Sequence, residues 1–489
     1  MRIFTRIAVL APCLLLLLQA CVTVGPDYEP PVPSTPDAWH AEAIEGLTEG
    51  EASLQTWWQQ LGDPVLEDLI RRAGASNLDL REALARILEA RARLGVVSGQ
   101  RLPAVDASAF YSYGKPSDQG VLEPLADLVG GFDAAGLYNG GLDASWEIDV
   151  FGRIRRSVES AAAGYQASIE DYRDVLVSLF ADIALNYVDV RSLQDRIAYA
   201  EANAEAQRAS VKLTRDLHDA GASSALDVSQ AESNLAATEA EIPALEIALS
   251  FALHRLAVLL GEAPGTLQEE LGRAGTIPAP PAEVATGLPA DLLRQRPDVR
   301  RAERQLAAQS ARIGVATADL YPRFSLSGFF ALEATDVSGL GDGSTWGIVP
   351  GLRWSLFDGG RIRSAIQVEE ALTEQALVRY EKTVLRALEE VENALVAFSL
   401  EQRRRESLRA AVVATERTVE LVEIQYRSGL TDFQNVLDAQ RSLFVRQDQL
   451  AVSDGQVTRN LIALYKALGG GWDPAAPAAV DEPPGDGER

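Results

Sequence analysis

The side chains best suited to covalent or metal chemistry are few in this sequence of 489 residues. There are two cysteines, Cys13 and Cys21, and three histidines, His40, His218 and His254, which lie in unrelated contexts. Neither set has the spacing of a metal site or of a disulfide framework. No glycine-rich phosphate loop follows a predicted strand, and no Ser/His/Asp set suggests itself. The sequence therefore predicts a protein that is not an enzyme and has no cofactor.

Cys21 is the residue to which a specific chemistry can be assigned. Arg2 and Arg6 precede an apolar run, which predicts a secretory signal peptide over residues 1–20. The stretch LQAC that ends at Cys21 resembles the lipobox of bacterial lipoproteins, in which the cysteine is lipidated and becomes the first residue. Gln19 is an unusual occupant of its position, so a plain secreted protein cut nearby is the alternative. No acidic residue follows Cys21 directly, which resembles outer-membrane sorting.

The composition narrows the class of protein. The net charge of −25 argues against nucleic acid as a partner, because phosphate binding needs clustered Lys and Arg. Ala, Leu, Glu, Gln and Arg are abundant and only 7% of residues are aromatic, which is typical of long helices and coiled coils.

A repeated stretch indicates that the chain is a tandem duplication. WEIDVFGRIR at 146–155 returns as WSLFDGGRIR at 354–363, so that Gly152–Arg153 and Gly360–Arg361 form equivalent strand-to-helix corners. Each copy is expected to run helix, strand, loop, strand, long helix, turn, helix. The expected organisation is a lipidated, proline-rich segment at 21–60, a first repeat at 61–261, a linker or equatorial segment at 262–290, a second repeat at 291–472 and a disordered tail at 473–489.

Two long stretches predict coiled-coil helices. Residues 152–219 and 361–428 contain no proline, and their apolar residues step by three and four. At ~1.5 Å per residue each helix would span about 100 Å, which is far longer than most helices of a globular bundle. The seam residues are Tyr165, Ile169, Tyr172, Leu176, Leu179, Ile183, Asn186, Val190, Leu193 and Ile197 in the first, and Val384, Leu388, Val391, Leu395, Phe398, Leu408, Val412, Thr415, Val419, Val422 and Tyr426 in the second.

Four shorter runs alternate apolar and other residues, as strands do. Each has about the 9–11 residues that a tilted strand needs to cross a bilayer. The alternative is a small soluble sheet packed against the helices. The predicted apolar faces are Val105, Ala107, Ala109, Tyr111 and Tyr113; Leu142, Ala144, Trp146 and Ile148; Phe324, Leu326, Gly328, Phe330 and Leu332; and Ile348, Leu352, Trp354 and Leu356. Pro350 weakens the last run, because proline lacks a backbone donor.

Four strands cannot close a barrel, and an open sheet edge in lipid leaves backbone groups unsatisfied. If the strands cross a membrane, several chains must therefore close one barrel. Three copies would supply twelve strands, an even number within the range of such barrels, and twelve helical passes that could form a tube.

The chain resembles the outer membrane efflux proteins, the TolC-like tunnel components of tripartite export pumps, and within them the lipoprotein branch that serves resistance-nodulation-division transporters. The stretches that carry the resemblance are CVTVGPDYEPP (21–31), WWQQLGDPVLEDLI (57–70), GLPADLLRQRPDVRRAE (287–303), YPRFSLSG (321–328) and YRSGLTDFQNVLDAQRSLF (426–444). The resemblance implies a mainly α homotrimer with a small β part. It implies a twelve-stranded barrel in the outer membrane and a periplasmic α-barrel below it, anchored by lipid on Cys21 and open to passive conduction.

The resemblance also implies where the functional residues lie. The turns between long helices form the periplasmic tip, where an adaptor (membrane fusion) protein docks beside the inner-membrane transporter. The docking positions are Gly221, Ala222, Ser223, Gly429, Leu430 and Thr431. Asp438 and Gln434 match the lumen-facing gate, where three Asp438 carboxylates would form a ring. Tyr426 and Asp227 match a latch between helices, although Thr431 departs from the basic residue that some members carry there.

Two other functions remain open at this stage. The same fold serves as the exit duct of type I protein secretion systems, although the lipobox and GLPADLLRQRPDVRRAE favour efflux. A lipid-tethered periplasmic coiled-coil scaffold without a pore is the alternative of a different class. It predicts monomeric behaviour after Cys21→Ser and no conductance in a planar bilayer.

Overall fold

In the computed structural model the chain forms two compact units, which are treated one at a time. The first comprises Met1–Pro31, Leu88–Ala167 and Ala302–Arg379, and the second comprises Val32–Ile87, Ser168–Arg301 and Tyr380–Arg489. The described residues are 23–33, 35–40, 47–48, 54–115, 117, 133–281, 284–285, 289–291 and 295–473. The predicted signal peptide, Cys21 and the predicted tail after Asp473 lie outside them.

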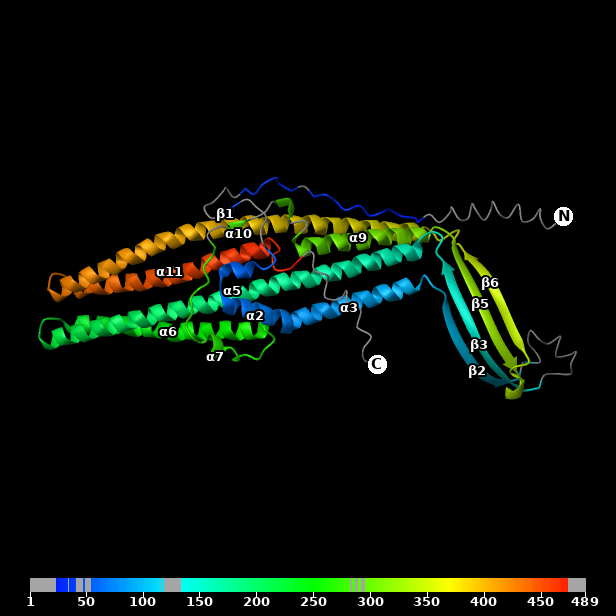
Figure 1. The fold of residues 1–489 in the computed structure, drawn as a ribbon, viewed down its shortest axis with the longest axis horizontal. Helices are drawn as coiled ribbons and strands as arrows, with labels where there is room; N and C mark the ends of the chain where they lie inside the picture. Colours follow the sequence, from blue (N-terminus) through cyan, green and yellow to red (C-terminus); the bar gives the residue numbers. More distant parts are fainter. Residues whose placement is uncertain are drawn as a thin grey trace. The chain divides into compact units, whose positions relative to one another are not determined.

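The first unit contains a four-stranded antiparallel sheet with the order β2-β3-β5-β6 (Figure 1). The strands are β2 (Ala104–Gly114), β3 (Ala135–Ile148), β5 (Arg323–Ala334) and β6 (Ser344–Arg353), with a short 3-10 helix, η3 (Val337–Gly339), between the last two. β2 and β6 are the edge strands, so each has one side that no described strand pairs with. Pro350 lies on the edge strand β6, where a missing donor is tolerated.

The register confirms the predicted apolar faces. Val105, Ala144, Gly328 and Ile348 pair in one row across all four strands, and directly paired residues share a face. Ala104, Ser145, Ser327 and Val349 form the next row, which belongs to the opposite face. Every residue of β2 is exposed and no residue of β3, β5 or β6 is buried, which argues against the alternative of a soluble sheet packed on the helices.

The predicted fourth strand was too long. β6 ends at Arg353, and Trp354 and Leu356 lie in the segment that leads to the corner at Gly360. The indole N–H of Trp354 donates to the carbonyl of Leu320 at 3.0 Å, as that of Trp146 does to the carbonyl of Arg101 at 3.0 Å. These bonds fix each tryptophan against the end of a helix, which alternation along the chain cannot reveal.

The helices confirm the duplication. The first copy is α3 (Leu78–Gly99), β2, β3, α5 (Arg153–Asp219) and α6 (Ala225–Leu259). The second is α9 (Pro297–Ala318), β5, β6, α10 (Arg361–Arg427) and α11 (Phe433–Ala467). α5 and α10 have 67 residues each and are continuous, as the absence of proline predicts. α10 runs unbroken through QRRRES, 402–407.

The second unit holds the main aromatic core. Trp57, in the 3-10 helix η1 (Trp57–Leu61), is fully buried and stacks on Tyr465 of α11 with ring centroids 5.3 Å apart. Trp58 meets Phe180 of α5 edge-on at 5.0 Å. Because η1 and α11 press on α5 here, α5 is buried well beyond its predicted seam between Val177 and Val190.

The stretch QRPDVRR closes the end of α11. The Arg296 guanidinium donates to the carbonyl of Ala467 at 2.8 Å, which satisfies one of the orphan carbonyls at that helix end. It also forms a two-pronged pair with Asp298 at 3.0 and 2.7 Å. The Trp472 ring lies within 4.5 Å of the Arg173 guanidinium and 5.2 Å of that of Arg300, which are cation–π distances.

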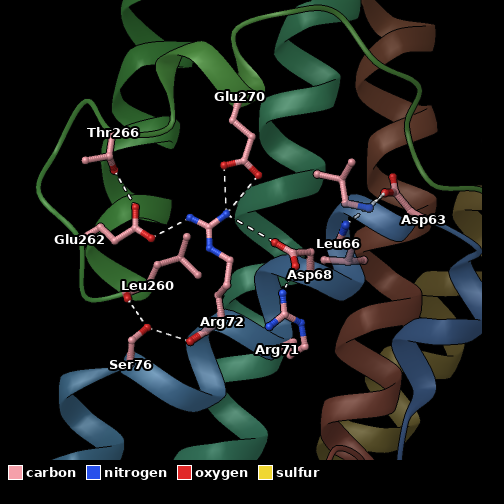
Figure 2. A network of polar contacts seen from close by, with 11 residues as sticks. Asp63, Leu66, Asp68, Arg71, Arg72, Ser76, Leu260, Glu262, Thr266 and Glu270 are labelled. Carbon is pink, nitrogen blue, oxygen red and sulfur yellow. Dashed lines mark hydrogen bonds and ion pairs between the residues drawn. The ribbon is translucent and has the colours of Figure 1, made fainter.

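The predicted linker at 262–290 is partly structured. It contains α7 (Gln268–Leu271), a two-residue strand β4 (Val284–Ala285) that pairs in parallel with β1 (Leu47–Thr48), and the start of η2 (Pro289–Asp291). Figure 2 shows how Arg72 of α2 (Pro64–Ser76) holds this segment: its guanidinium contacts Glu262 at 2.7 Å and Glu270 at 3.0 Å. Ser76 donates to the carbonyl of Leu260 at 2.6 Å, close to the same place.

Among the described helices, α6 is long and apolar enough to cross a membrane by length and composition alone. A single helix of this kind is weak evidence for a span, because core helices pass the same test. The fold gives α6 a different setting, since it forms a helical hairpin with α5 through the turn at Gly221.

Candidate functional site

Both turns between long helices are built by a left-handed glycine. Gly221 has φ +74° and Gly429 has φ +71°. In each turn the next residue reaches back over five positions, with Ala222 N–H donating to the Leu217 carbonyl at 2.7 Å and Leu430 N–H to that of Gln425 at 2.9 Å. This is the Schellman arrangement, in which orphan carbonyls at a helix end are satisfied and glycine accepts the positive φ.

The helices after the turns begin differently. Ser224 caps α6, and Asp227 completes a capping box by accepting from the Ser224 amide at 3.3 Å. The Ser223 hydroxyl also donates to Asp227 at 2.7 Å. Asp432, the N-cap residue of α11, makes no side-chain capping bond, and the nearby Asn435 side-chain amide donates to the Thr431 hydroxyl at 2.7 Å. The tip therefore has one rigid turn and one less constrained turn.

The two predicted latch residues do not hydrogen-bond to each other within the chain. Burial opposes ionisation of Asp227, but hydrogen bonds from Ser223 and the Ser224 amide outweigh it and hold the pKa below its ordinary value of 3.8. The Tyr426 hydroxyl is buried and has no hydrogen-bond partner among the described residues, while its ring lies 5.2 Å from that of Phe433. The latch between helices stays a prediction.

Asp438 and Gln434 lie one turn apart on the exposed side of α11. The side-chain amide of Gln434 donates to the Asp438 carboxylate at 3.0 Å. The opposite side of this part of α11 is anchored in an apolar cluster that joins it to α5 and α6 and against which Leu235, Val422 and Tyr426 pack. The buried members of the cluster are Val211, Ala231, Phe433, Val436 and Leu437. The carboxylate is thus presented outward by a helix whose inner face is fixed.

The first strand-to-helix corner is more elaborate than the sequence suggested. Gly152 has φ +83°, which allows the turn. Asp149 caps α5 by accepting from the Ile154 and Arg155 amides at 3.0 and 2.8 Å. Glu147 forms a two-pronged pair with Arg153 at 2.9 and 2.8 Å. Both carboxylates bind the start of the helix, where its dipole favours negative charge.

The second corner uses the same means at shifted positions. Gly359 and Gly360 have φ values of +66° and +89°. Asp358 accepts from the Gly360 amide at 2.9 Å and from the Ile362 amide at 2.8 Å. Arg361 is the first residue of α10. A signal for these caps was present in the sequence, since each Asp stands a few residues before a long helix.

An extended segment that follows Cys21 contacts the first corner. An added Cβ on Gly152 would lie 2.7 Å from the Thr23 side chain, so only glycine fits against this segment. Gly25, with φ +88°, crosses α9 so closely that its added Cβ would lie 2.4 Å from the Gly314 Cα. Buried Arg156 of α5 secures the crossing by donating to the carbonyls of Val24 and Gly25 and to Asp27. Sequence reasoning missed Arg156.

Among the described residues no group of three His, Cys, Asp or Glu side chains is placed to hold a metal ion. The second unit thus offers a pair of glycine turns and an outward carboxylate on the helix after one of them. The first unit offers a sheet without buried residues.

Comparison with known proteins decides the family. The family model described as outer membrane efflux protein matches residues 69–262 and 288–470. The chain belongs to the outer membrane efflux protein family. Nodulation protein T of Rhizobium leguminosarum bv. trifolii is 33% identical over 98% of this chain and 100% of its own length. Outer membrane protein OprJ of Pseudomonas aeruginosa is 32% identical over 94% of each chain. The solved outer-membrane channel OprN superposes with a TM-score of 0.85 at 39% identity, covering 92% of this chain and 99% of that one.

Family membership confirms the expected fold and the general function. The chain has the fold of the outer membrane efflux channels, in which long helices accompany a small β part, and it is an outer membrane efflux protein. The family and its solved members are channel proteins. The two matched stretches each contain one copy of the duplicated elements.

Proposed function

We propose that three copies of this chain form the exit duct of a tripartite efflux pump. The open sheet supports this proposal, because the described strands leave one side of β2 and one side of β6 unpaired and all of β2 is exposed. In lipid each unsatisfied backbone group costs several kcal/mol, so these edges need partners. Pairing β6 of one copy with β2 of the next closes a barrel of twelve strands, and the helices of three copies continue it as an α-barrel in the periplasm.

The N-terminal segment suits a lipid anchor on Cys21. Thr23 is held at the corner by Gly152, next to the end of β3. A lipid chain attached two residues earlier would therefore enter the bilayer beside the strands, where burial contributes ~0.8 kcal/mol per CH₂. The proposed location is the outer membrane, with lipid anchoring and a periplasmic projection.

The tip is the proposed gate. Three Asp438 carboxylates around the trimer axis would repel one another and focus a negative potential, which can bind cations. Gln434 orients each carboxylate through its hydrogen bond. Tyr426 and Asp227 would act as a latch between neighbouring helices. The exposed Leu430, together with the glycine turns, offers an apolar surface on which the adaptor protein docks.

The cargo is proposed to be drugs or other small solutes that the duct conducts passively. Named relatives include a pyoverdine export protein and a toluene efflux pump protein, so cargo differs among similar chains. An inner-membrane resistance-nodulation-division transporter would supply the energy and the choice of cargo.

Conductance of the purified protein in a planar bilayer tests this function. Wild type is expected to be a trimer of low conductance, and Asp438→Ala is expected to raise conductance several-fold because the charge ring is removed. Asp448→Ala is the matched control, since that carboxylate on the same helix is held by Arg196 at 2.7 Å. A monomer that never conducts would instead identify a scaffold, and an equal rise in both variants would exclude Asp438 as the gate.

A further inference from the structure

Directly after the proposed gate, two polar side chains join α11 to its neighbours. Gln440 is buried, and its amide donates to the Ser210 hydroxyl of α5 at 2.8 Å and to the Glu423 carboxylate of α10 at 3.2 Å. One side chain thus links three helices. Gln440 lies two residues after Asp438, so this contact is the first layer of packing beyond the carboxylate.

The same layer recurs seven residues further along α11. The side-chain amide of Asn203 in α5 donates to the side-chain oxygen of Gln447 at 2.7 Å. The side-chain amide of Gln447 donates in turn to the Glu416 carboxylate of α10 at 3.3 Å. Each member of this second layer is seven residues from its counterpart in the first, on all three helices. The two layers therefore occupy equivalent positions of one coiled-coil seam.

Polar layers in such a seam have a known physical effect. They fix the register of the helices, because a shifted helix leaves buried polar groups unpaired. They also stabilise the association of the helices less than apolar residues would. The side-chain oxygen of Gln440 (Oε1) is buried but accepts no hydrogen bond from the described residues, so this layer is not packed for greatest stability. The apolar cluster around Phe433 and Leu437 lies just before it on the same helix.

We propose that Gln440 and Gln447 are positioning residues of the gate, an inference that rests on the proposed function. They keep α11, and with it Asp438, in one register against α5 and α10. Apolar side chains at these positions would hold the helix more tightly, so the polar layers keep the register while leaving α11 able to move. Leucine at both positions would bind α11 more tightly, whereas glutamate would place a carboxylate opposite Glu423 and opposite Glu416 and loosen it.

The test compares Gln440→Leu/Gln447→Leu with Gln440→Glu/Gln447→Glu in the full-length trimer. Gln449→Leu is the matched control, because among the described residues the Gln449 side chain hydrogen-bonds only to Arg446 of its own helix. Amide exchange of α11 peptides and single-channel recordings are made on each variant, alone and combined with Asp438→Ala. The leucine pair is expected to slow exchange and lower the open probability roughly fivefold or more, and the glutamate pair to do the opposite, at unchanged single-channel conductance.

The two readouts separate this inference from the proposed gate. If Asp438→Ala has no effect but the two pairs still shift exchange and open probability in opposite directions, the gate assignment fails and the positioning role stands. If amide exchange of α11 in the leucine and glutamate pairs matches that of the Gln449→Leu control, the positioning role is wrong. It is also wrong if amide exchange changes while the open probability does not.

Discussion

Arg72 is a single side chain that joins segments almost two hundred residues apart. Its guanidinium contacts Glu262 and Glu270 and lies 3.6 Å from Asp68 (Figure 2). Within the part of the chain that the structure describes, neighbouring Arg71 pairs only with Asp68, one turn earlier on its own helix. The two arginines therefore have the same charge and nearly the same place but different structural roles.

Arg72→Ala is expected to destabilise the protein by about 1–2 kcal/mol, because two carboxylates lose a shared charged donor. Arg71→Ala is expected to change stability by less than about 0.5 kcal/mol, since its side chain is 73% exposed against 26% for Arg72. Thermal unfolding followed by the helical signal measures both. Equal losses in the two variants would show that the contacts to the linker contribute nothing.

The same cluster predicts a dependence on pH. Hydrogen bonds from Arg72, more than the opposing effect of burial, hold the pKa of Glu262 below its ordinary value of 4.5, and Thr266 adds to this. A lowered folded pKa contributes stability above pH 4.5 that is lost as the pH falls through the folded value. Wild type should therefore lose more stability than Glu262→Gln between pH 5 and pH 3, a range set by ~4.5 for a free glutamate. If the free energy of unfolding falls equally with pH in the two proteins, the lowered pKa of Glu262 does not contribute to stability.

At the scale of elements, the two copies share positions but not neighbours. Gly314 of α9 and Gly95 of α3 are equivalent in the duplication, yet only Gly314 is crossed by the N-terminal segment. An added Cβ on Gly314 would lie 2.7 Å from the Arg156 side chain, whereas nothing lies within 4 Å of one on Gly95. Gly314 is therefore needed for the close approach of the N-terminal segment and Arg156, whereas no such contact requires glycine at position 95.

Gly314→Ala is expected to destabilise the protein by about 1–3 kcal/mol, because Arg156 and the crossing segment must move. Gly95→Ala is expected to be neutral or to stabilise by up to about 1 kcal/mol, since alanine favours the helix. Melting temperatures of the two variants, with proteolysis of the N-terminal segment, give the comparison. Faster proteolysis in Gly95→Ala than in Gly314→Ala would contradict the crossing as its cause.

The periodicity of apolar residues predicts the helices and strands, but it cannot predict features that depend on contacts between segments distant in the sequence. The strand faces and the long helices follow from spacing alone, and so do the corners at Gly152 and Gly360. The end of β6 does not, because Trp354 continues the alternation but is fixed to a helix end instead. Gln440 and Gln447 were overlooked because a search for apolar seams passes over polar seam positions, and the crossing at Gly314 requires knowledge of which segment lies on which helix.

For the whole molecule, the central physical question is which solvent each face of the sheet meets. Ile348 shares its row with Val105, Ala144 and Gly328, while the next residue, Val349, shares its row with Ser145 and Ser327. In a closed barrel the apolar face meets lipid and the polar face meets the aqueous lumen. Both residues are exposed within one chain, so burial inside the chain does not distinguish them.

Arginine at each position makes the distinction. Ile348→Arg is expected to cost about 2–4 kcal/mol if the side chain lies near the middle of the bilayer, whereas Val349→Arg would reach water in the lumen at little cost. The yield of heat-modifiable trimer in the outer membrane should therefore fall sharply for Ile348→Arg and remain near wild type for Val349→Arg. Similar yields for both would mean that the sheet does not separate lipid from water, and the reverse order would mean that the barrel closes with the opposite face outward.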